Sequence, residues 1–393
     1  MWVFWTLLIL LMIGFAKLST IALNRTLALA QPKWVITLTE VIQVLLLPVF
    51  LGLVCTEFGN QRFVEQLQES GWSALTPLQT TLIAIGGTGF VLFLNSIFVY
   101  QMYRPPQCQI ACESAVLDFR QSESERPWQE ELIGIGPMRR LAFLPGNEQF
   151  SLEVSTQTYV IPRLPKEWDG LSIVHLTDTH FCGAVTRKYF ELVCDQAAAL
   201  EPDLFVFTGD LLDDQSKLAW LPETFGRLKA PLGQFFILGN HDWYLDAKEI
   251  REEFQQQGWV DLSSQSRGIQ LAGKNSPLIL AGDETPWMGK HPELVARQDS
   301  QVRVLLSHTP DNLEWARQNE FDLMLSGHTH GGQIRFPIIG PVYSPSRYGC
   351  RYASGVFWRD PTLMCVSRGI SGREPIRYLC RPELTKIILR TET

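Results

Sequence analysis

The chain has 393 residues, enough for two or three domains, and 46% of its side chains are hydrophobic. Its net charge of -7 and the lack of a basic run in its C-terminal half argue against nucleic acid as a partner. Its eight cysteines are irregularly spaced without a CxxC pair, which argues against the common zinc and redox motifs and predicts small buried or loop residues.

Apolar residues are concentrated at the N-terminus, in three stretches at about residues 1–16 or longer, 34–55 and 80–101. A helix needs about 20 mostly apolar residues to cross the hydrocarbon core of a bilayer. The second and third stretches meet this length, whereas the first is at the lower limit. A secretory signal peptide would carry basic residues before its apolar core, but here they follow it. We therefore expect residues 1–103 to form a membrane region with two or three transmembrane helices.

The charged residues between these stretches predict the orientation of the chain. Lys17, Arg25 and Lys33 lie between the first and second stretches, whereas the loop at residues 57–69 holds three acids and one arginine. By the positive-inside rule the basic loop faces the cytoplasm, and the chain returns to that side at Arg104. We expect a protein of the inner (cytoplasmic) membrane whose C-terminal part faces the cytoplasm.

Residues 104–149 contain mixed polar sequence with scattered Gly and Pro and are expected to form a linker. From residue 150 to 393, short apolar runs alternate with helix-length stretches, which predicts an α/β domain with buried, largely parallel strands. The expected strands are 151–161, 171–176, 204–207, 234–238, 278–281, 302–306, 323–325 and 384–389. The expected helices are 186–200, 247–257 and 310–318.

Acids, an amide and histidines follow five of these runs directly, at the strand ends where α/β proteins bind ligands. Each residue alone fits a helix cap or a turn, but a soluble core has no reason to gather all of them. Carboxylate and imidazole groups suit divalent metals, and two such ions can clamp both oxygens of a phosphoryl displacement. The sequence therefore predicts a dinuclear metal site built from Asp178, His180, Asp210, Asn240, His308, His328 and His330, with His241 beside it.

Other polar residues fit ordinary structural roles at least as well. His175 falls inside an expected strand and is expected to be packed in the core, and His291 is expected to be exposed in a loop. Asp213 and Asp214 fit either contacts to a ligand or a solvated loop. Asp283 also follows a strand, but without a motif around it. The remaining candidates, Arg347, Arg351 and Arg373, are expected mostly as surface residues, although each is placed where it could meet a phosphate.

The motifs resemble those of the calcineurin-like metallophosphoesterase superfamily. The similar segments are Asp178-Thr-His180, Gly209-Asp210-Leu-Leu-Asp213, Gly239-Asn240-His241-Asp242, His308 and Gly327-His328-Thr-His330. The segments around Trp168, Gly331-Gly332-Gln333, Ser367-Arg-Gly369 and Pro382-Glu383 resemble the bacterial membrane-associated branch, which includes enzymes similar to the UDP-2,3-diacylglucosamine hydrolases. The resemblance implies a four-layer α/β/β/α sandwich over residues 150–393.

The resemblance also implies which of these residues bind each metal ion and which transfer a proton. One ion would be held by Asp178, His180, Asp210 and His330, and the other by Asp210, Asn240, His308 and His328. His241 would stay off the metals and protonate the leaving oxygen, with Asp242 orienting its ring. The ions would be manganese, zinc or iron.

These observations predict a membrane-anchored, metal-dependent phosphodiesterase or pyrophosphatase that uses a metal-bridged hydroxide, possibly on a lipid or lipid-linked nucleotide. One alternative is a phosphomonoesterase like the protein phosphatases, against which the sequence Leu211-Leu212-Asp213-Asp214 argues, because those enzymes carry an arginine soon after the second motif. A second alternative is a non-catalytic metal-binding scaffold, although no ligand of the set is missing. A third is a membrane sensor whose phosphoesterase domain is secondary, suggested by Glu40 within an apolar stretch.

Overall fold

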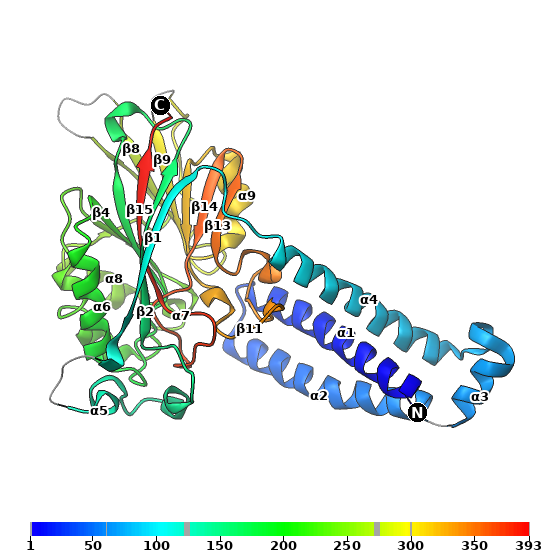
Figure 1. The fold of residues 1–393 in the computed structure, drawn as a ribbon. Helices are drawn as coiled ribbons and strands as arrows, with labels where there is room; N and C mark the ends of the chain where they lie inside the picture. Colours follow the sequence, from blue (N-terminus) through cyan, green and yellow to red (C-terminus); the bar gives the residue numbers. More distant parts are fainter. Residues whose placement is uncertain (1, 60, 122–125, 271–275, 299–300, 393) are drawn as a thin grey trace. The chain divides into compact units, whose positions relative to one another are not determined.

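The computed structural model describes residues 2–59, 61–121, 126–270, 276–298 and 301–392, and the chain divides into two compact units (Figure 1). The helical unit comprises Met1–Tyr103 and Pro337–Arg351. The α/β unit comprises Arg104–Phe336 and Tyr352–Thr393. A short segment in the second half of the sequence therefore belongs to the unit formed by the N-terminus.

Three long helices build the helical unit: α1 (Trp2–Leu27), α2 (Lys33–Phe58) and α4 (Pro77–Gln101). The short helix α3 (Gln61–Ser70) lies between α2 and α4 in the chain. Among the described residues, three helices are long and apolar enough to cross a membrane, and the spans are Phe4–Leu27, Lys33–Phe58 and Pro77–Gln101. The first span is thus longer than the apolar stretch seen in the sequence, because the helix continues past Lys17.

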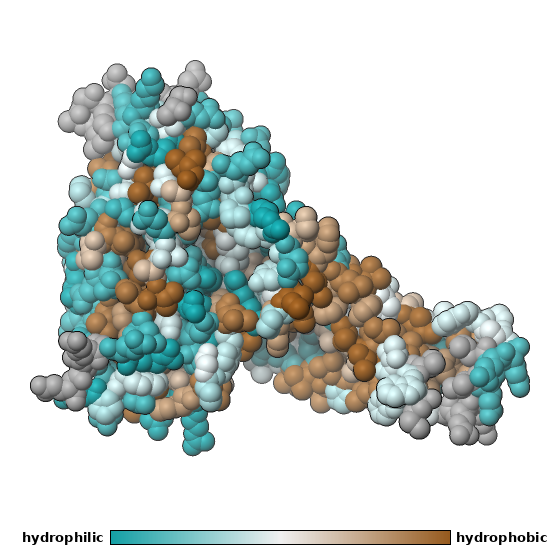
Figure 2. All heavy atoms as spheres, viewed as in Figure 1, coloured by the Kyte–Doolittle hydropathy of each residue, from teal (hydrophilic) through white to brown (hydrophobic). Residues whose placement is uncertain are grey.

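The long helices expose apolar side chains and contact one another through small residues. Val44 and Leu45 of α2 are 68% and 60% exposed, and apolar residues cover much of the visible surface of the helices (Figure 2). A Cβ atom on Gly14 of α1 would collide with the backbone of Gly86 and Phe90 in α4. Close backbone contact combined with an apolar exterior is the pattern of helices that pack within a bilayer.

The segment Pro337–Arg351 lies against the C-terminal ends of α1 and α4. The Gln101 side chain donates a hydrogen bond of 2.6 Å to the Ile338 carbonyl, and the buried Asn24 accepts one of 3.1 Å from the amide of Ser344. A Cβ atom on Gly340, whose φ is 76°, would collide with the ring of Tyr100. Both helix ends are therefore in contact with this segment.

The α/β unit contains two sheets with separate strand orders. The first sheet has the order β1-β2-β15-β3-β4-β5-β6, in which β3, β4, β5 and β6 run parallel. Its strands are β1 (Gln109–Asp118), β2 (Ser151–Val160), β3 (Ser172–Leu176), β4 (Leu204–Thr208), β5 (Gln234–Ile237), β6 (Val260–Asp261) and β15 (Glu383–Arg390). The strands expected at residues 151–161, 171–176, 204–207, 234–238 and 384–389 all appear here.

The second sheet has the order β13-β14-β10-β9-β8-β7, with β8, β9, β10 and β14 parallel. Its strands are β7 (Ser266–Ile269), β8 (Leu278–Asp283), β9 (Val302–Ser307), β10 (Leu323–Ser326), β13 (Gly355–Arg359) and β14 (Thr362–Val366). Two short strands, β11 (Arg335–Phe336) and β12 (Gly340–Pro341), follow β10 in the chain. The expected strands at 278–281, 302–306 and 323–325 are β8, β9 and β10.

A shared hydrophobic core holds the two sheets face to face. Ile173 and Val206 of the first sheet pack with Leu280, Val304 and Leu325 of the second, all fully buried. The strands are buried on both faces, so alternate residues enter different cores: Val174 and Phe207 point to the outer side of the first sheet. This explains why the strands read as continuous apolar runs in the sequence.

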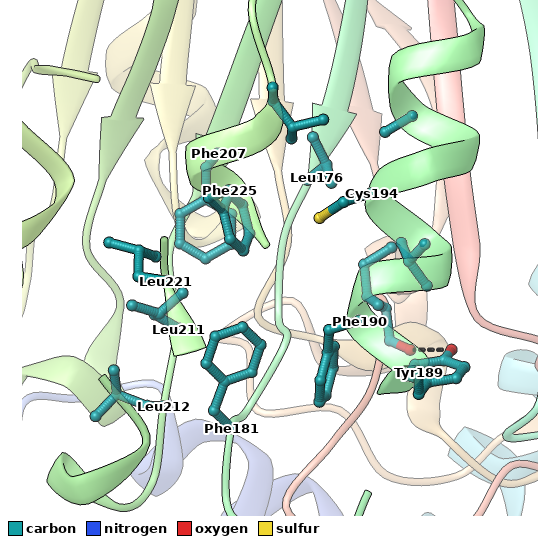
Figure 3. Packing of buried hydrophobic residues seen from close by; sticks show 14 of the residues in the cluster. Leu176, Phe181, Tyr189, Phe190, Cys194, Phe207, Leu211, Leu212, Leu221 and Phe225 are labelled. Carbon is teal, nitrogen blue, oxygen red and sulfur yellow. Dashed lines mark hydrogen bonds between the residues drawn. The ribbon is translucent and has the colours of Figure 1, made fainter. Parts of the chain in front are cut away.

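Helices cover the outer sides of the sheets and complete the expected α/β/β/α arrangement. α6 (Arg187–Ala199) and α8 (Ala247–Gln256) pack on the first sheet, and α9 (Leu313–Gln318) lies next to β14. Figure 3 shows the outer core of the first sheet, where Phe181, Phe190, Phe207 and Phe225 pack together. Truncating one such buried aromatic to alanine costs about 3–5 kcal/mol, so this core holds its surrounding loops firmly.

Residues 104–149 are part of the α/β unit, which differs from the linker that we expected. β1 pairs antiparallel with β2 over residues 109–118, and the short helix α5 (Trp128–Leu132) follows. Phe119, Leu132 and Ile133 enter the outer core. Local sequence patterns did not indicate this, because β1 is largely exposed and lacks the apolar run of the central strands.

Candidate metal centre

The first sheet brings four of the predicted ligands to one edge. Asp178 and His180 follow β3, Asp210 follows β4, and Asn240 begins the short helix α7 (Asn240–Trp243) after β5. Because β3, β4 and β5 are neighbouring parallel strands, their carboxyl ends lie together. Phe181 and Leu212, which follow these ligands in the chain, form a β-bridge and are buried in the outer core. The loops that carry the ligands are therefore anchored by packing.

The second sheet supplies the remaining three ligands from β9 and β10, which are also parallel neighbours. His308 follows β9, and His328 and His330 follow β10. The Nε2 atom of His308 lies 3.2 Å from Asp210 Oδ2 and 3.0 Å from Asn240 Oδ1. The Nε2 atom of His330 lies 3.4 Å from Asp178 Oδ1. The two sheets thus meet at a single group of ligand-type side chains.

These side chains form two clusters that share Asp210. In each, the candidate ligand atoms lie within 4.8 Å of one another: one contains Asp178, His180, Asp210 and His330, and the other contains Asp210, His308 and His328. The Nε2 atoms of His180 and His330 are 3.1 Å apart. This donor set fits divalent metal ions, because imidazole nitrogens and carboxylate oxygens converge and a shared carboxylate can bridge two sites.

The backbone is strained at five of the seven predicted ligands. Asp178, His180, Asp210, His328 and His330 have φ between 48° and 69°, the left-handed region that residues other than glycine rarely adopt. Each such residue costs about 1–3 kcal/mol and persists where the surroundings hold it, most often at functional sites.

Glycines next to the ligands allow the close approach. A Cβ atom on Gly239 would collide with Asp210 Oδ1 and stand 2.7 Å from His308 Cε1. A Cβ atom on Gly327 would collide with Asp178 Oδ2. Any larger residue at these positions would push a predicted ligand out of place.

Three ligand histidines are oriented through their Nδ1 atoms. His308 Nδ1 donates to the Thr208 carbonyl at 2.7 Å, and His330 Nδ1 donates to the Ser371 carbonyl at 3.0 Å. His180 Nδ1 lies 3.1 Å from Asp213 Oδ2. Each contact leaves Nε2 as the nitrogen that faces the cluster, which is how metal-binding histidines are commonly held.

His241 is in neither of the two clusters that share Asp210, but it forms a third group of close ligand-type side chains with His180 and Asp213. Its backbone amide donates to Asp210 Oδ1 at 2.8 Å, and its Nδ1 atom contacts Asp213 Oδ1. Its side chain is 29% exposed, compared with 14% for His330 and at most 1% for His180 and His308. His241 is therefore more accessible to a substrate than these three histidines.

We expected Asp242 to orient the His241 ring, but its carboxylate binds backbone amides instead. It accepts hydrogen bonds from the amides of Gly239, Asp210, Leu211 and Leu212 at 2.9–3.3 Å. The acid that contacts the His241 imidazole is Asp213. From the sequence, Asp213 fitted a contact to a ligand and a solvated loop equally well. Asp242 points inward from α7, so it fixes the loops after β4 and β5 instead.

The electrostatics of the site favour bound positive charge. Burial opposes the charged form of His308, but Asp210 raises its pKa to about 9 through charge and hydrogen bonding. Burial likewise opposes charge on His241, but Asp210 and Asp213 raise its pKa to about 10. The carboxylates thus favour a proton on His308 that a bound divalent cation would displace, because metal binding to such ligands releases protons.

Two residues near the clusters carried no signal in the sequence. The Trp287 ring lies 4.8 Å from that of His328 and 5.6 Å from that of His308, so it forms a wall beside the second cluster. The buried Arg377 donates to the His330 carbonyl at 3.2 Å and to the Arg368 carbonyl at 2.6 Å. Both lie in irregular segments, where no strand-end pattern marks them.

The remaining candidates lie outside the clusters. His175 is buried and its Nε2 atom is 2.8 Å from Thr208 Oγ1, as expected of a packed residue. His291 is 44% exposed, and its Nδ1 atom lies 2.8 Å from the buried Asp283. Asp214 accepts from the amide of Ser216. The three arginines divide: Arg373 is 63% exposed beside Glu374, while Arg347 and Arg351 belong to the helical unit.

Comparison with known proteins places this site in a family. Residues 171–332, which contain all seven predicted ligands, match the family model described as calcineurin-like phosphoesterase. The chain is 30% identical over 253 residues to the uncharacterized metallophosphoesterase YkuE of Bacillus subtilis, covering 62% of this chain and 87% of that protein.

Two further relatives carry more descriptive names. The phosphodiesterase YaeI of Escherichia coli is 29% identical over 224 residues, which cover 55% of this chain and 81% of that protein. A transmembrane protein with metallophosphoesterase domain from Danio rerio is 28% identical over 260 residues, which cover 58% of this chain and 55% of that protein. The chain belongs to the calcineurin-like phosphoesterase family and is a metal-dependent phosphoester hydrolase.

Proposed function

We propose that this hydrolase is a membrane-anchored phosphodiesterase, or a pyrophosphatase acting on a phosphoanhydride, that works with two divalent cations. The observation that carries the proposal is that Asp210 belongs to both ligand clusters while His241 stands beside them. One ion would be held by Asp178, His180, Asp210 and His330, and the other by Asp210, Asn240, His308 and His328. The donor set admits manganese, zinc or iron.

Bound cations in such a site polarise the phosphoryl oxygens and lower the pKa of a water molecule. Within the chain, Asp213 holds His241 through Nδ1, which leaves Nε2 to donate a proton to the leaving oxygen. The raised pKa of His241, about 10, keeps it protonated at neutral pH, as an acid requires. Positive ions nearby would lower this pKa toward neutrality and ease the transfer.

A diester substrate is favoured over a phosphoprotein. The protein phosphatases of this superfamily carry an arginine soon after the second motif and a glutamate after the third, whereas this chain has Leu211-Leu212-Asp213-Asp214 and Asp242 at those places. An E. coli relative is named a phosphodiesterase. The three candidate spans support a substrate at the membrane, so we propose a lipid or a lipid-linked nucleotide.

Lys17, Arg25 and Lys33 support an inner-membrane protein whose α/β unit faces the cytoplasm. A reporter fused after Thr393 that is active only outside the cytoplasm would overturn this orientation.

The test is hydrolysis by full-length protein in detergent with added manganese. Bis(p-nitrophenyl) phosphate and p-nitrophenyl phosphate distinguish a diesterase from a monoesterase, and a second panel of phospholipids and UDP-linked acyl sugars addresses the substrate. We expect cleavage of the diester by the wild type and at least about 10³-fold less by Asp210→Ala, since metal assistance is worth several kcal/mol. Equal activity of Asp210→Ala and wild type would overturn the proposal.

A further inference from the structure

The segment Pro337–Arg351 adds two arginines to a charged end of the helical unit. α1 and α4 lie side by side with the same direction, since Leu11 and Gly14 of α1 meet Gly86 and Gly89 of α4. Their C-terminal ends therefore lie at the same end, where α2 begins five residues after α1 finishes. Asn24 and Gln101 hold the segment at that end.

Most charged side chains toward this end of the unit are positive, and the first acid of the chain, Glu40, lies seven residues after Lys33 in α2. Lys17, Arg25 and Lys33 come from the first two helices, and Arg347 and Arg351 come from the segment; we call these five residues the basic end. Residues 1–39 and 337–351 contain no acid. Arg25, Lys33, Arg347 and Arg351 are exposed. Hydrogen bonding of Asn24 to Ser344 brings the two parts of the basic end together, because Arg25 and Arg347 are close neighbours of these residues in the chain.

The basic end lies at the level of lipid headgroups. Helices of 25 or 26 residues are about 38 Å long, whereas the hydrocarbon core is about 30 Å thick, so the last turns reach the polar region. Exposed aromatic residues mark the same level, where their rings commonly form a belt: Trp34 is 68% exposed, Tyr343 42%, Tyr100 39% and Tyr103 37%.

We propose that the basic end is a binding site for the headgroups of anionic phospholipids. Positive side chains just outside a transmembrane helix attract anionic lipids, and each is worth about a fivefold factor in affinity near the membrane surface. Four of the five residues are exposed, and together with the aromatic rings at headgroup level they complement a phosphate-rich surface. The site is independent of the metal centre, which lies in the other unit.

The segment also connects the basic end to the metal centre along the chain. Only six residues separate His330 from Pro337, where the chain enters the helical unit. The lipid-binding arginines are thus on the same connection as two metal ligands of the second sheet. Anionic lipid would hold this connection at the membrane surface.

The experiment uses the full-length chain in detergent micelles, titrated with short-chain phosphatidylglycerol, short-chain phosphatidylcholine or inorganic phosphate, with binding observed by native mass spectrometry. We expect wild type to prefer phosphatidylglycerol. Arg347→Gln with Arg351→Gln should weaken that binding by about tenfold to thirtyfold, because two charges are lost. Arg347→Lys with Arg351→Lys should keep it, since an anionic surface responds to charge more than to guanidinium geometry.

Matched controls remove two exposed basic residues of the α/β unit, Lys248→Gln with Arg267→Gln, and should bind lipid as the wild type does. Unchanged phosphatidylglycerol binding in the Arg347 and Arg351 double variant would overturn the proposal. Inorganic phosphate that competes as well as the lipid would also overturn it, by revealing a free-phosphate site. So would an unchanged lipid affinity with a raised KM for a soluble diester, because the arginines would then serve the substrate.

Discussion

The helical unit and the metal centre both reverse the usual distribution of polar and apolar groups, for opposite reasons. In the helical unit, apolar side chains such as Val44 and Leu45 point outward. In the α/β unit, Asp178, Asp210 and His308 are buried with at most 1% exposure. A soluble protein tolerates neither arrangement without a partner. The length and composition of the three helices suggest lipid as the partner of the first, and we propose that the partner of the second is a pair of cations.

The largest expected effect comes from removing the proton donor at the edge of the buried polar region. His241→Ala should lower kcat for a diester by about 10²–10⁴-fold, the range that general acid catalysis contributes. His241 is in neither cluster that shares Asp210, although it lies close to His180 and Asp213, so we expect metal content to stay at the wild-type level. Steady-state kinetics and elemental analysis of the same preparation check this. Loss of metal together with activity would instead make His241 a ligand.

A charge on the outward face of the helices tests the other half of the comparison. Leu45→Arg places an arginine near the middle of α2, where insertion costs about 3–4 kcal/mol more than for leucine. We expect a smaller membrane-inserted fraction in cell fractionation. Leu144→Arg is the matched control: Leu144 is 40% exposed in the α/β unit, and its replacement should leave insertion unchanged. Equal insertion of both variants would contradict the assignment of α2 as a span.

His175 is a buried histidine outside the clusters, so the effect of burial on its pKa can be tested separately from metal binding. Burial lowers its pKa to about 4, below the ordinary value of 6.5. The unfolded chain therefore binds more protons between these values, and stability falls as pH decreases from about 6.5 to about 4, by up to about 3 kcal/mol. His175→Asn should flatten this part of a plot of Tm against pH. An identical pH dependence in wild type and variant would exclude His175 as the cause.

The acids that end the second and third motifs, Asp213 and Asp242, should give different defects of moderate size. Asp213→Asn loses the charge that holds His180 and His241, and should reduce metal affinity or activity by about 10–100-fold with little loss of stability. Asp242→Ala leaves four backbone amides without their acceptor and should lower the free energy of unfolding by at least about 1–3 kcal/mol. Denaturation and kinetics measured on both variants separate the roles, and matching profiles would contradict them.

Local sequence patterns predicted the elements whose signal is local. The strands β3, β4, β9 and β10 are short apolar runs closed by a ligand, so both the element and its functional end are visible in the chain. β1 belongs to the first sheet, and Pro337–Arg351 belongs to the helical unit, because of contacts with residues that are distant in the sequence. No local sequence pattern indicates such contacts. Asp213 and Asp242 are both acids within motifs, and only the direction of each side chain decides which of them meets His241.

The most direct test of the account is the number of metal ions bound per chain, measured by elemental analysis of full-length wild type and of Asp210→Asn. Asp210 belongs to both clusters, so the account predicts two ions per wild-type chain and the weakening of both sites in the variant. A wild-type chain that binds a single ion at saturating manganese or zinc would contradict it. So would an Asp210→Asn variant that still binds two ions with wild-type affinity.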